Sequence, residues 1–518
     1  MKKTINYSWA VSLIFLVLLF TTFSCSKESV EESVTETPVV EANLQPIKVF
    51  GQHSPEATKT TLDEVATSWV AGDKVGVFST EARAQAGGAG EVGVANAPFT
   101  AASSELKSGF NGTMYWGAEN ASHSFYAYYP YAAGSLAATA VPVSLLAAQT
   151  QSQAGNSAHL GALDFLIATP VTVTSPNNTE TANGVSLTYN HLFTVIEFHI
   201  KGTGSLKAIS LIANETLAFS GGTVDITKPT PEAGEAYTLA SLTGTSKETK
   251  VMLTTPASLT ATSTDTKVYM VINPSTPTGN CLIGLLVDGA NWKYTIKAAP
   301  SSGFKRGKKY IVTIDASTSD FGTVVGPGGV WMDRNLGATR VATSSKDAQA
   351  YGYYYQWGRG NDGHQESTSG TSTALSSTAV PSDPSNQGKF IIGSGNFYDW
   401  IAPQIHSLWQ GGANDNNPCP NGFRIPTYSE WNNVRGTLTG SNKAEAAFNS
   451  SLKLPAAGCR TYTDLFSLVG YHSFYWSSGT ADTKSYYLNL TSGLGSAGTA
   501  LMKSNVRSSG YSVRCIKD

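Results

Sequence analysis

Short apolar runs with a two-residue alternation fill residues 46–316 and predict β-strands. In "GVSLTY", Val185, Leu187 and Tyr189 fall on one face, as in a strand with one buried side. The run "LFTVIEFHI" (192–200) is apolar at odd and even positions, which is typical of a strand buried on both faces. Turns rich in Pro, Gly, Asn and Ser separate the runs, and no long amphipathic helical pattern interrupts them. We therefore predict a mostly β fold in which sheets pack as β-sandwiches.

The first residues have the pattern of a secretory signal. Lys2 and Lys3 precede the apolar run "WAVSLIFLVLLF", and small residues then lead to Cys25. A membrane-spanning helix needs ~20 apolar residues and this run is shorter, so we predict a signal peptide over residues 1–24. The sequence before Cys25 resembles the bacterial lipobox, which implies that Cys25 is acylated (palmitate, for example) and anchors the protein in the cell outer membrane. The alternatives are an ordinary signal peptide with an incidental cysteine, and a membrane anchor.

Composition narrows the class of protein further. Residues 25–45 are rich in Ser, Thr, Glu and Pro and lack aromatic side chains, which predicts a flexible acidic tether. A lysine and acidic residues just after an acylated cysteine also resemble the surface-export signal of Bacteroidetes lipoproteins. The chain has 35 basic and 37 acidic side chains, so it lacks the electrostatic footprint of a nucleic-acid-binding protein. Its 518 residues predict two or three domains, and its five cysteines fit an oxidising exterior.

Several phrases in residues 46–316 resemble the fimbrillin family, the Mfa-like and FimA-like subunits of Bacteroidetes type V pili. The resemblance implies two β-sandwich subdomains, divided near residues 175–185, and assembly with other fimbrillin subunits by donor-strand exchange. The phrases occur in the family's order and spacing; they are "WVAGDKVGVF" (69–78), "FNGTMYWGAENASHSFYAYYPY" (110–131), "LDFLIA" (163–168) and "LTYNHLFTVIEFHI" (187–200).

The same resemblance implies how the subunit matures. In the family, a protease removes the first strand after a basic residue, and a neighbour's C-terminal strand fills the groove. Here the first strand is predicted at "QPIKVFG" (45–51), where Pro46 indicates an edge strand. The basic residue at the matching place is Lys59, and the alternative is an ordinary loop lysine. The chain continues past "YIVTIDAS" (310–317) into a further domain, so we expect a subunit that accepts a strand without donating one, at the pilus tip.

A second domain is predicted over residues 326–518, after a linker at residues 317–325 within the Gly- and Ser-rich stretch "STSDFGTVVGPGG". Its phrases resemble the major paralogous domain first named from Fibrobacter, which is related to the C-type-lectin-like fold and, more distantly, to formylglycine-generating enzymes. The resemblance implies an α+β C-type-lectin-like domain. The phrases are "GVWMDRNLGAT" (329–339), "YGYYYQWGRG" (351–360), "CPNGFRIPTYSEW" (419–431), "LKLPAAGCR" (452–460), "YWSSG" (475–479) and "YSVRCIKD" (511–518).

The motif "CPNGFRIPTYSEW" is interpreted as a helix start that fixes the fold. Thr427 followed by Glu430 has the spacing of a capping box, in which each side chain bonds the other residue's backbone N–H. Trp431 then falls in the first helical turn as an anchor, and Arg424 on the preceding strand is placed to pair with a carboxylate. We therefore expect a structural role for these residues and no catalytic one.

The resemblance to C-type-lectin-like folds, which bring the terminal strand back to the core, implies a disulfide between Cys419 and Cys515. Cys281 and Cys459 then stay as thiols. The alternatives are a Cys459–Cys515 link and four free thiols.

The resulting hypothesis is a surface lipoprotein of the pilus (fimbrium) that mediates cell adhesion through its C-terminal domain, with an unidentified glycan or protein of a host or bacterial surface as ligand. We expect no catalytic residue, cofactor or metal site: the calcium-binding triplets of lectins are absent, and the oxygen-rich stretch "GGANDNN" (411–417) fits a solvated loop. The alternatives are an enzyme on the C-terminal domain, either a formylglycine-generating-like oxidase or a carbohydrate-active enzyme, and a surface ligand-capture lipoprotein outside any pilus.

Overall fold

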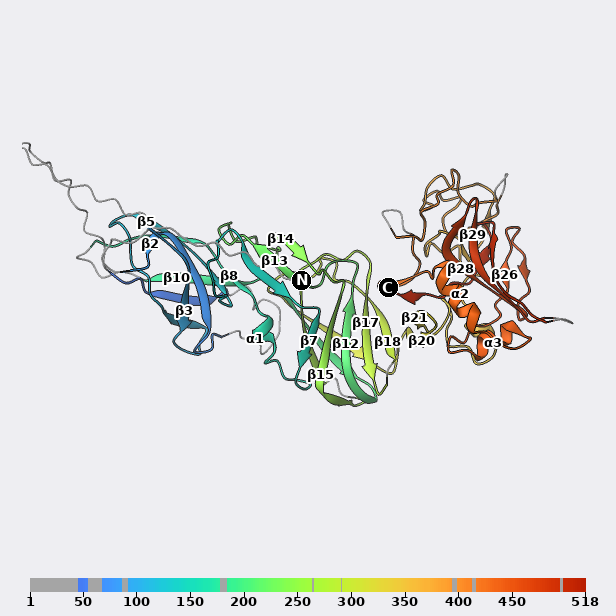
Figure 1. Ribbon diagram of the computed structural model, residues 1–518, viewed down its shortest axis with the longest axis horizontal. Coiled ribbons are helices and arrows are strands. Elements are labelled where there is room, and N and C mark those ends of the chain that lie inside the picture. Colours follow the sequence, from blue (N-terminus) through green and yellow to red (C-terminus); the bar gives the residue numbers. More distant parts are fainter. Residues whose placement is uncertain are drawn as a thin grey trace, which may run out of the picture. The chain divides into compact units, whose positions relative to one another are not determined.

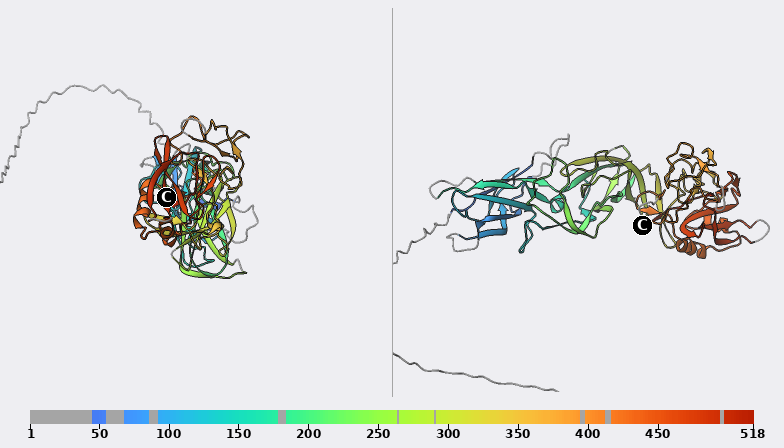
Figure 2. Two further views of the ribbon diagram at one scale, coloured as in Figure 1. Left: turned by 90° about the vertical axis from the view of Figure 1, so that its right-hand side faces the viewer. Right: turned by 90° about the horizontal axis from the view of Figure 1, so that it is seen from above.

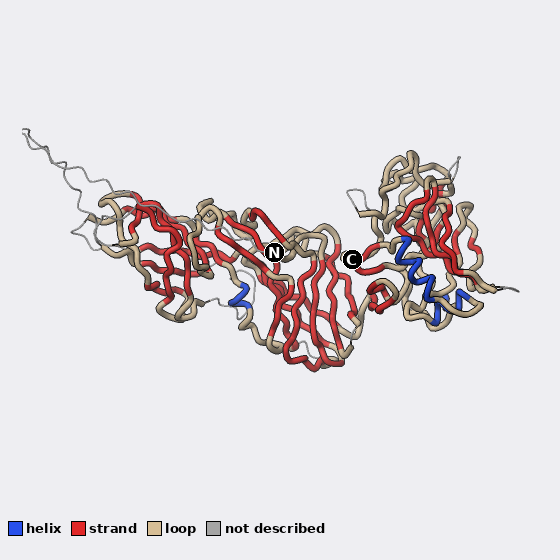
Figure 3. The backbone as a smooth tube through the Cα atoms, viewed as in Figure 1, coloured by secondary structure: helices blue, strands red, loops and turns tan. Residues whose placement is uncertain are grey.

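The structure is a computed structural model of the 518-residue chain, and strands make up most of its regular structure (Figure 3). Cys25, Lys59, the predicted signal peptide and nearly all of the predicted tether lie outside the residues that the structure describes. The described residues are 45–54, 68–85, 92–177, 184–262, 265–289, 291–393, 398–411, 416–493 and 497–518.

The first sheet closes into a barrel. Its order is β2-β3-β4-β1-β10-β8-β5, and β5 also pairs with β2, which joins the two ends of the sheet (Figure 1). The predicted sandwich is therefore wrong for this region, because that pairing removes the sheet edges. Side chains of these strands fill one core. The strands are β1 (Val49–His53), β2 (Lys74–Arg83), β3 (Val92–Ala101), β4 (Lys107–Asn111), β5 (Ser122–Tyr129), β8 (Leu166–Ala168) and β10 (Val185–His191), with β9 (Val171–Thr174) extending the sheet beside β5.

β1 is a strand of the barrel wall with a neighbour on each side, so the edge position predicted from Pro46 is also wrong. β1 pairs with β10 in parallel and with β4 in antiparallel orientation. Pro46 precedes β1, at an isolated bridge to Tyr115, and its missing N–H therefore leaves the β1 ladders intact.

A β-sandwich follows the barrel, as predicted for the second subdomain. Phe198 and Ile200 from one layer and Ile209 from the other belong to a single core. The strand predicted to be buried on both faces is β11, which lies in the middle of its layer. One layer is β16-β11-β19, with β11 (Thr194–Lys201), β16 (Thr266–Ile272) and β19 (Lys309–Asp315); the other contains β12 (Gly204–Ile212), β15 (Glu248–Leu259), β17 (Asn280–Val287) and β18 (Trp292–Ala298).

The chain passes from barrel to sandwich between β10 and β11, after His191. This change comes later than the division expected near residues 175–185, because β10 completes the barrel beside β1. The two regions are also interleaved, since two strands that precede β10 pair with strands that follow it. These strands are β6 (Val141–Leu145), which pairs with β13 (Phe219–Val224) beside β14 (Leu239–Thr243), and β7 (Ala148–Gln151), which pairs with β15; the short helix α1 (Leu160–Leu163) follows β7.

The segment predicted as a linker contains a strand that is hydrogen-bonded on both sides. In β20, Phe321 pairs with Tyr294 of β18, and Thr323 pairs with Met332 of β21. The strand forms because Phe321 is buried among aromatic rings, which a flexible linker would expose. The C-terminus, which is also marked in both views of Figure 2, lies next to β21 (Figure 1), as the pairing of β21 with β32 requires. The strands are β20 (Phe321–Gly326), β21 (Gly329–Met332), β25 (Phe423–Arg424) and β32 (Ile516–Lys517).

The C-terminal region combines helices with short sheets. The helices α2 and α3 contact β29, and three long strands form the sheet β28-β29-β30. Within the described residues, none of the helices has the length and hydropathy of a membrane-spanning segment. The elements are α2 (Tyr428–Thr437), α3 (Lys443–Asn449), η2 (Ala348–Ala350), β22 (Tyr355–Gln356), β23 (Thr371–Ser372), β24 (Phe390–Ile391), β26 (Cys459–Arg460), β27 (Phe466–Ser467), β28 (His472–Ala481), β29 (Lys484–Thr491), β30 (Ala500–Asn505) and β31 (Gly510–Tyr511).

Candidate functional site

The predicted capping box is present at the start of α2. The Glu430 N–H donates to the Thr427 hydroxyl (3.2 Å), and the Thr427 N–H donates to the Glu430 carboxylate (2.8 Å). Arg424 binds the same carboxylate with both terminal nitrogens, at 2.8 and 2.7 Å. Although burial opposes it, hydrogen bonds from Arg424 and Thr427 lower the pKa of Glu430. The side chains of Arg424, Thr427 and Glu430 are thus engaged with one another.

Trp431 anchors α2 to the strands beneath it. Its side chain is fully buried, and its Nε1 donates to the carbonyl of Trp476 (2.9 Å) on β28. The ring lies 4.9 Å from Trp331 and 5.3 Å from Tyr475, measured between centroids. The indole therefore has no free face for a ligand.

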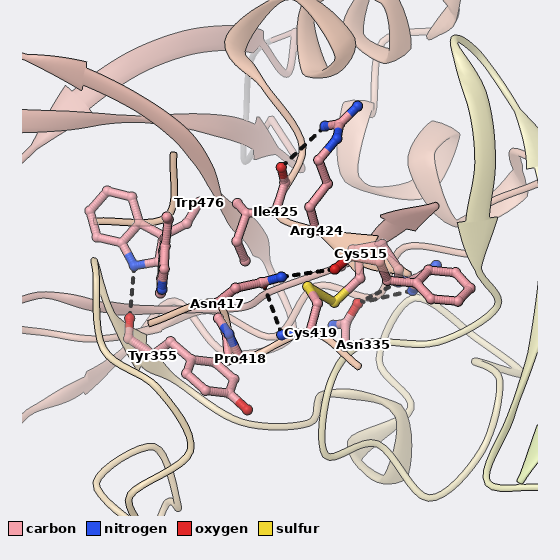
Figure 4. The surroundings of a disulfide bond; sticks show 12 residues. Asn335, Tyr355, Asn417, Pro418, Cys419, Arg424, Ile425, Trp476 and Cys515 are labelled. Carbon is pink, nitrogen blue, oxygen red and sulfur yellow. Dashed lines mark hydrogen bonds between the residues drawn. A yellow bond between two sulfur atoms is a disulfide. The ribbon is translucent and has the colours of Figure 1, made fainter. Parts of the chain in front are cut away.

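A disulfide joins Cys419 to Cys515, the pair that the resemblance implied (Figure 4). Cys515 is completely buried in the last residues of the chain, and Cys419 precedes β25. The Asn417 side chain holds the turn before β25, because it accepts from the Cys419 N–H and donates to the Phe423 carbonyl. Cys281 and Cys459 are buried thiols, and burial raises the pKa of each to about 11. A nucleophilic thiolate is therefore disfavoured at both positions.

Arg359, Asp362 and His364 form a buried ionic cluster next to β22. Asp362 accepts from Arg359 and from His364 Nδ1 (2.5 Å), while His364 Nε2 accepts from the Gln356 N–H (3.1 Å). Burial, reinforced by the positive charge of Arg359, lowers the pKa of His364 to about 4. Within the described residues, no group of three or more His, Cys, Asp or Glu side chains is arranged to hold a metal ion. We interpret the cluster as part of the scaffold.

Many of the large aromatic side chains of the C-terminal region lie in its core. Trp357, Trp400, Trp409, Tyr475 and Trp476 are all buried. The exposed aromatic and aliphatic side chains lie elsewhere, and sequence reasoning missed them. We define the 462–471 surface as Tyr398, Tyr462, Leu465, Phe466, Leu468, Val469 and Tyr471.

The 462–471 surface is the densest exposed apolar stretch in the described part of the chain. Six of its seven members come from one ten-residue segment, and Leu465 is 65% exposed. Tyr398, from a distant loop, packs against Tyr462 in a tilted arrangement with ring centroids 4.9 Å apart. Exposed apolar side chains concentrated in one segment are candidates for an interaction site. The signal in the sequence was the run "YTDLFSLVGY", whose only charge is Asp464.

Buried contacts fix the backbone that carries this surface. Arg460 Nε donates to Asp464 (2.6 Å), and its other nitrogens donate to Ser369 and to the Glu366 carbonyl. The Arg460 guanidinium also lies over the ring of Phe390, 4.1 Å from its centroid. The surface is therefore ordered before any partner arrives, which reduces the entropy lost on binding.

A second candidate site lies where β1 ends in the barrel. A cavity of about 520 Å³ adjoins the last residue of β1, His53, and is lined by aromatic, acidic and basic side chains. The His53 ring packs at a tilt against Trp69 (4.6 Å) and stacks on His191 (5.9 Å), and His191 Nδ1 lies 2.8 Å from Asp164. Burial lowers the pKa of His53 to about 4, whereas Asp164 raises the pKa of His191 in spite of its burial. The last side chain of a strand in the position of β1, which is His53 here, therefore lines the cavity.

Comparison with known proteins assigns a family to residues 58–327 of the chain. A family model described as Fimbrillin-like matches residues 58–327, more than half of the chain. The family comprises structural subunits of pili. The chain belongs to the fimbrillin-like family. We found no match among curated proteins.

Solved structures show weaker similarity. A proposed cell adhesion protein of Bacteroides uniformis is 16% identical, with a TM-score of 0.34 over 53% of this chain and 93% of that one. A fimbrial protein of Bacteroides ovatus is 13% identical, with a TM-score of 0.28 over 92% of this chain and 99% of that one. A fimbrial assembly protein of Parabacteroides distasonis is 13% identical, with a TM-score of 0.28 over 56% of this chain and 94% of that one. The family assignment does not depend on these structures.

Proposed function

We propose that this fimbrillin-like chain is the tip subunit of a pilus and adheres to other surfaces through its C-terminal region. The proposal includes acylation at Cys25 and anchoring at the outer membrane, cleavage after Lys59, and exchange of β1 for a strand of another subunit. It also includes a C-type-lectin-like fold for residues 326–518. The pairing of the terminal strand β32 with β21 and β25 supports that fold.

The observation that carries adhesion is the 462–471 surface. It presents aromatic and aliphatic side chains on a backbone held by buried Arg460, which suits an interface anchor. Leu465, Leu468 and Val469 have no hydrogen-bonding groups to offer sugar hydroxyls, which lose water when they bind. We therefore propose a protein ligand with an apolar face.

The path of the chain after β19 supports a place at the tip. β19 pairs with β11 inside the sandwich, and the chain then enters β20, which is bonded to β18 and β21. No segment after β19 ends as a free strand within the described residues, so the C-terminal part has no strand to donate. A subunit that accepts a strand and donates none terminates a polymer.

Adhesion is tested by disrupting the surface while keeping the fold. Leu465→Ser combined with Val469→Ser should weaken binding about tenfold or more, as loss of an apolar anchor does. The matched control is Leu106→Ser in the barrel, since Leu106 is as exposed (60%) as Leu465. Purified full-length chains would be applied to arrays of surface proteins and glycans. Equal binding by both variants would contradict the proposed surface, and a glycan signal that survives in the double variant would contradict the protein ligand.

The position in the pilus is tested on whole cells. Immunogold against residues 326–518 should mark one end of each fibre. Labels spaced along the shafts would exclude the tip, and labels on cells without fibres would favour ligand capture outside a pilus. Cys25→Ala should abolish labelling by a fatty-acid analogue and release the protein from the membrane fraction.

A further inference from the structure

β1 and its flanking residues are hydrogen-bonded along both sides. Val49 to His53 pair with Val185 to Tyr189 of β10, and Val49 to Gln52 pair with Phe110 to Lys107 of β4. Beyond the strand itself, the Ile47 N–H donates to the Met114 carbonyl (2.8 Å). A strand that takes this place therefore lies between the edges of β4 and β10. Its backbone N–H and C=O groups find hydrogen-bond partners whatever its side chains are, proline excepted. Selectivity has to come from its side chains.

Alternate residues of this segment point into the barrel. Ile47, Val49 and Gly51 are buried, whereas Phe50 is half-buried on the outer face and Gln52 is exposed. This is the two-residue period of a strand with one buried side. Of the three successive inward positions, the first two hold large apolar side chains, Ile47 and Val49. The third, Gly51, has only a hydrogen atom as its side chain.

The glycine is demanded by space. A Cβ at residue 51 would lie 2.5 Å from Cε2 of Phe110 and 3.1 Å from Cε2 of Tyr189. The φ angle of Gly51 lies outside the left-handed region, so backbone conformation makes no such demand. At 2.5 Å a side-chain carbon overlaps the ring, and the ring has to move.

Trp69 prevents those two rings from moving freely. Its buried indole meets the edges of Phe110 and Tyr189, with centroids 5.0 Å away in both cases. Its Nε1 also donates to the carbonyl of Gly51 (3.1 Å). The three rings form an aromatic box around residue 51, which we define as Trp69, Phe110 and Tyr189.

The neighbouring strand offers a contrast within the same sheet. Gly109 of β4 pairs with Phe50, and a Cβ at residue 109 would meet only the Phe50 ring, at 3.8 Å. That distance is an ordinary contact. Space is therefore restricted at residue 51 and is available one strand away.

Building on the strand exchange proposed above, we infer that the strand which replaces β1 must carry glycine at the register of Gly51. It must also carry apolar side chains at the registers of Ile47 and Val49. The partner is therefore a fimbrillin-type subunit whose donor segment reads apolar, any, apolar, any, glycine. Any other residue at the fifth place has to displace Phe110 or Tyr189 against Trp69, and the aromatic box thereby selects the partner.

The glycine requirement is tested with peptides. A specific protease site placed between His53 and Trp69 in the full-length chain allows β1 to be cut and removed under mild denaturant. A fluorescent peptide of residues 45–54 should then bind, and its Gly51→Val form should bind roughly 10- to 100-fold more weakly, the range that overpacking of a tight core produces. The control peptide carries Gln52→Ala at the exposed position and should bind like the native peptide. Binding of the Gly51→Val peptide within about twofold of native would overturn the inference.

The partner is identified in assembled pili. Ser186 of β10 is exposed and pairs with Phe50, so a photo-crosslinking residue at position 186 captures the strand in the slot. Mass spectrometry should recover a foreign segment with glycine at the Gly51 register, and a bulky residue there would overturn the inference. Recovery of the chain's own residues 45–54 would instead overturn the strand exchange, while the peptide measurement still decides the glycine requirement.

Discussion

The barrel and the C-terminal region hold their terminal strands in different ways. β1 is attached by backbone hydrogen bonds and by packing in the aromatic box, and no disulfide joins it to the rest of the described chain. The last strand of the chain, β32, directly follows Cys515, which is bonded to Cys419 beside β25. The first arrangement is the one that the proposed strand exchange requires, because no disulfide holds β1 in place. The second fixes the fold that presents the 462–471 surface.

The cores of the barrel and of the C-terminal region also differ in the polarity of their buried side chains. The barrel is filled by apolar and aromatic side chains around Trp69. The C-terminal region also buries Arg514, whose guanidinium donates to the Asn335 side chain and to the Met332 and Leu452 carbonyls. A buried charge with many specific partners tolerates few alternative packings. The comparison restricts the proposed strand exchange to one region, and the following predictions test that restriction.

The largest effect is expected from the disulfide. Replacing Cys419 and Cys515 together by serine removes a link across 96 residues and should destabilise the C-terminal region by about 4–5 kcal/mol, as chain entropy predicts. Hydrogen exchange should show lost protection in β31 and unchanged protection in β10. The matched control is Cys281→Ser in the sandwich. Equal loss of protection in barrel and C-terminal region would break the comparison.

Two tryptophans should separate the regions with similar energies. Trp69→Ala and Trp431→Ala each remove a buried indole and should each cost about 3–5 kcal/mol. Only Trp69→Ala should accelerate the release of β1, because only Trp69 contacts Gly51. The rate is measured by loss of the cleaved, labelled strand. Faster release in the Trp431→Ala variant would contradict independent regions.

Acid should weaken the C-terminal region. The folded-state pKa of His364, about 4, lies below the usual 6.5, so the unfolded chain binds the proton first as pH falls. Stability should therefore fall between pH 6.5 and 4, by about 3 kcal/mol in total. In the barrel, His53 acts in the same direction, but the raised pKa of His191 acts in the opposite one, since its contribution is present at low pH and lost as pH rises. Urea midpoints of the two regions measured across this range should diverge, and parallel profiles would refute the assignment.

The smallest effect is expected at the helix cap. Thr427→Ala should destabilise the C-terminal region by about 1 kcal/mol, because the Glu430 N–H loses its acceptor. The control is Ser429→Ala, an exposed position two residues later in the same helix. Chemical denaturation of both variants gives the comparison, and an equal effect would show that the cap contributes nothing specific.

Local features could be predicted from the sequence because their interactions connect neighbouring residues. Thr427 and Glu430 are three residues apart, and the predicted capping box is confirmed. The alternation of Val185, Leu187 and Tyr189 reported burial on one face, and all three are buried.

Long-range features could not be predicted in this way. Barrel closure depends on pairs such as Val77 with Ala127. The sequence of neither segment indicates that the two strands pair. The aromatic box needs Trp69, Phe110 and Tyr189 to meet at Gly51, which only the closed barrel achieves. The exposed 462–471 surface was missed because a run of apolar residues does not by itself show whether its side chains are buried or exposed.

Closure of the barrel has a consequence for the timing of the proposed strand exchange. While β1 is in place, the ring of strands presents no open edge between β4 and β10. Loss of β1 would expose two unpaired edges at once, and open edges join other chains indiscriminately. While the barrel is open, pairing with the correct strand therefore competes with aggregation. In the proposed exchange, aggregation is avoided only if the cut strand stays in place until its replacement has begun to pair.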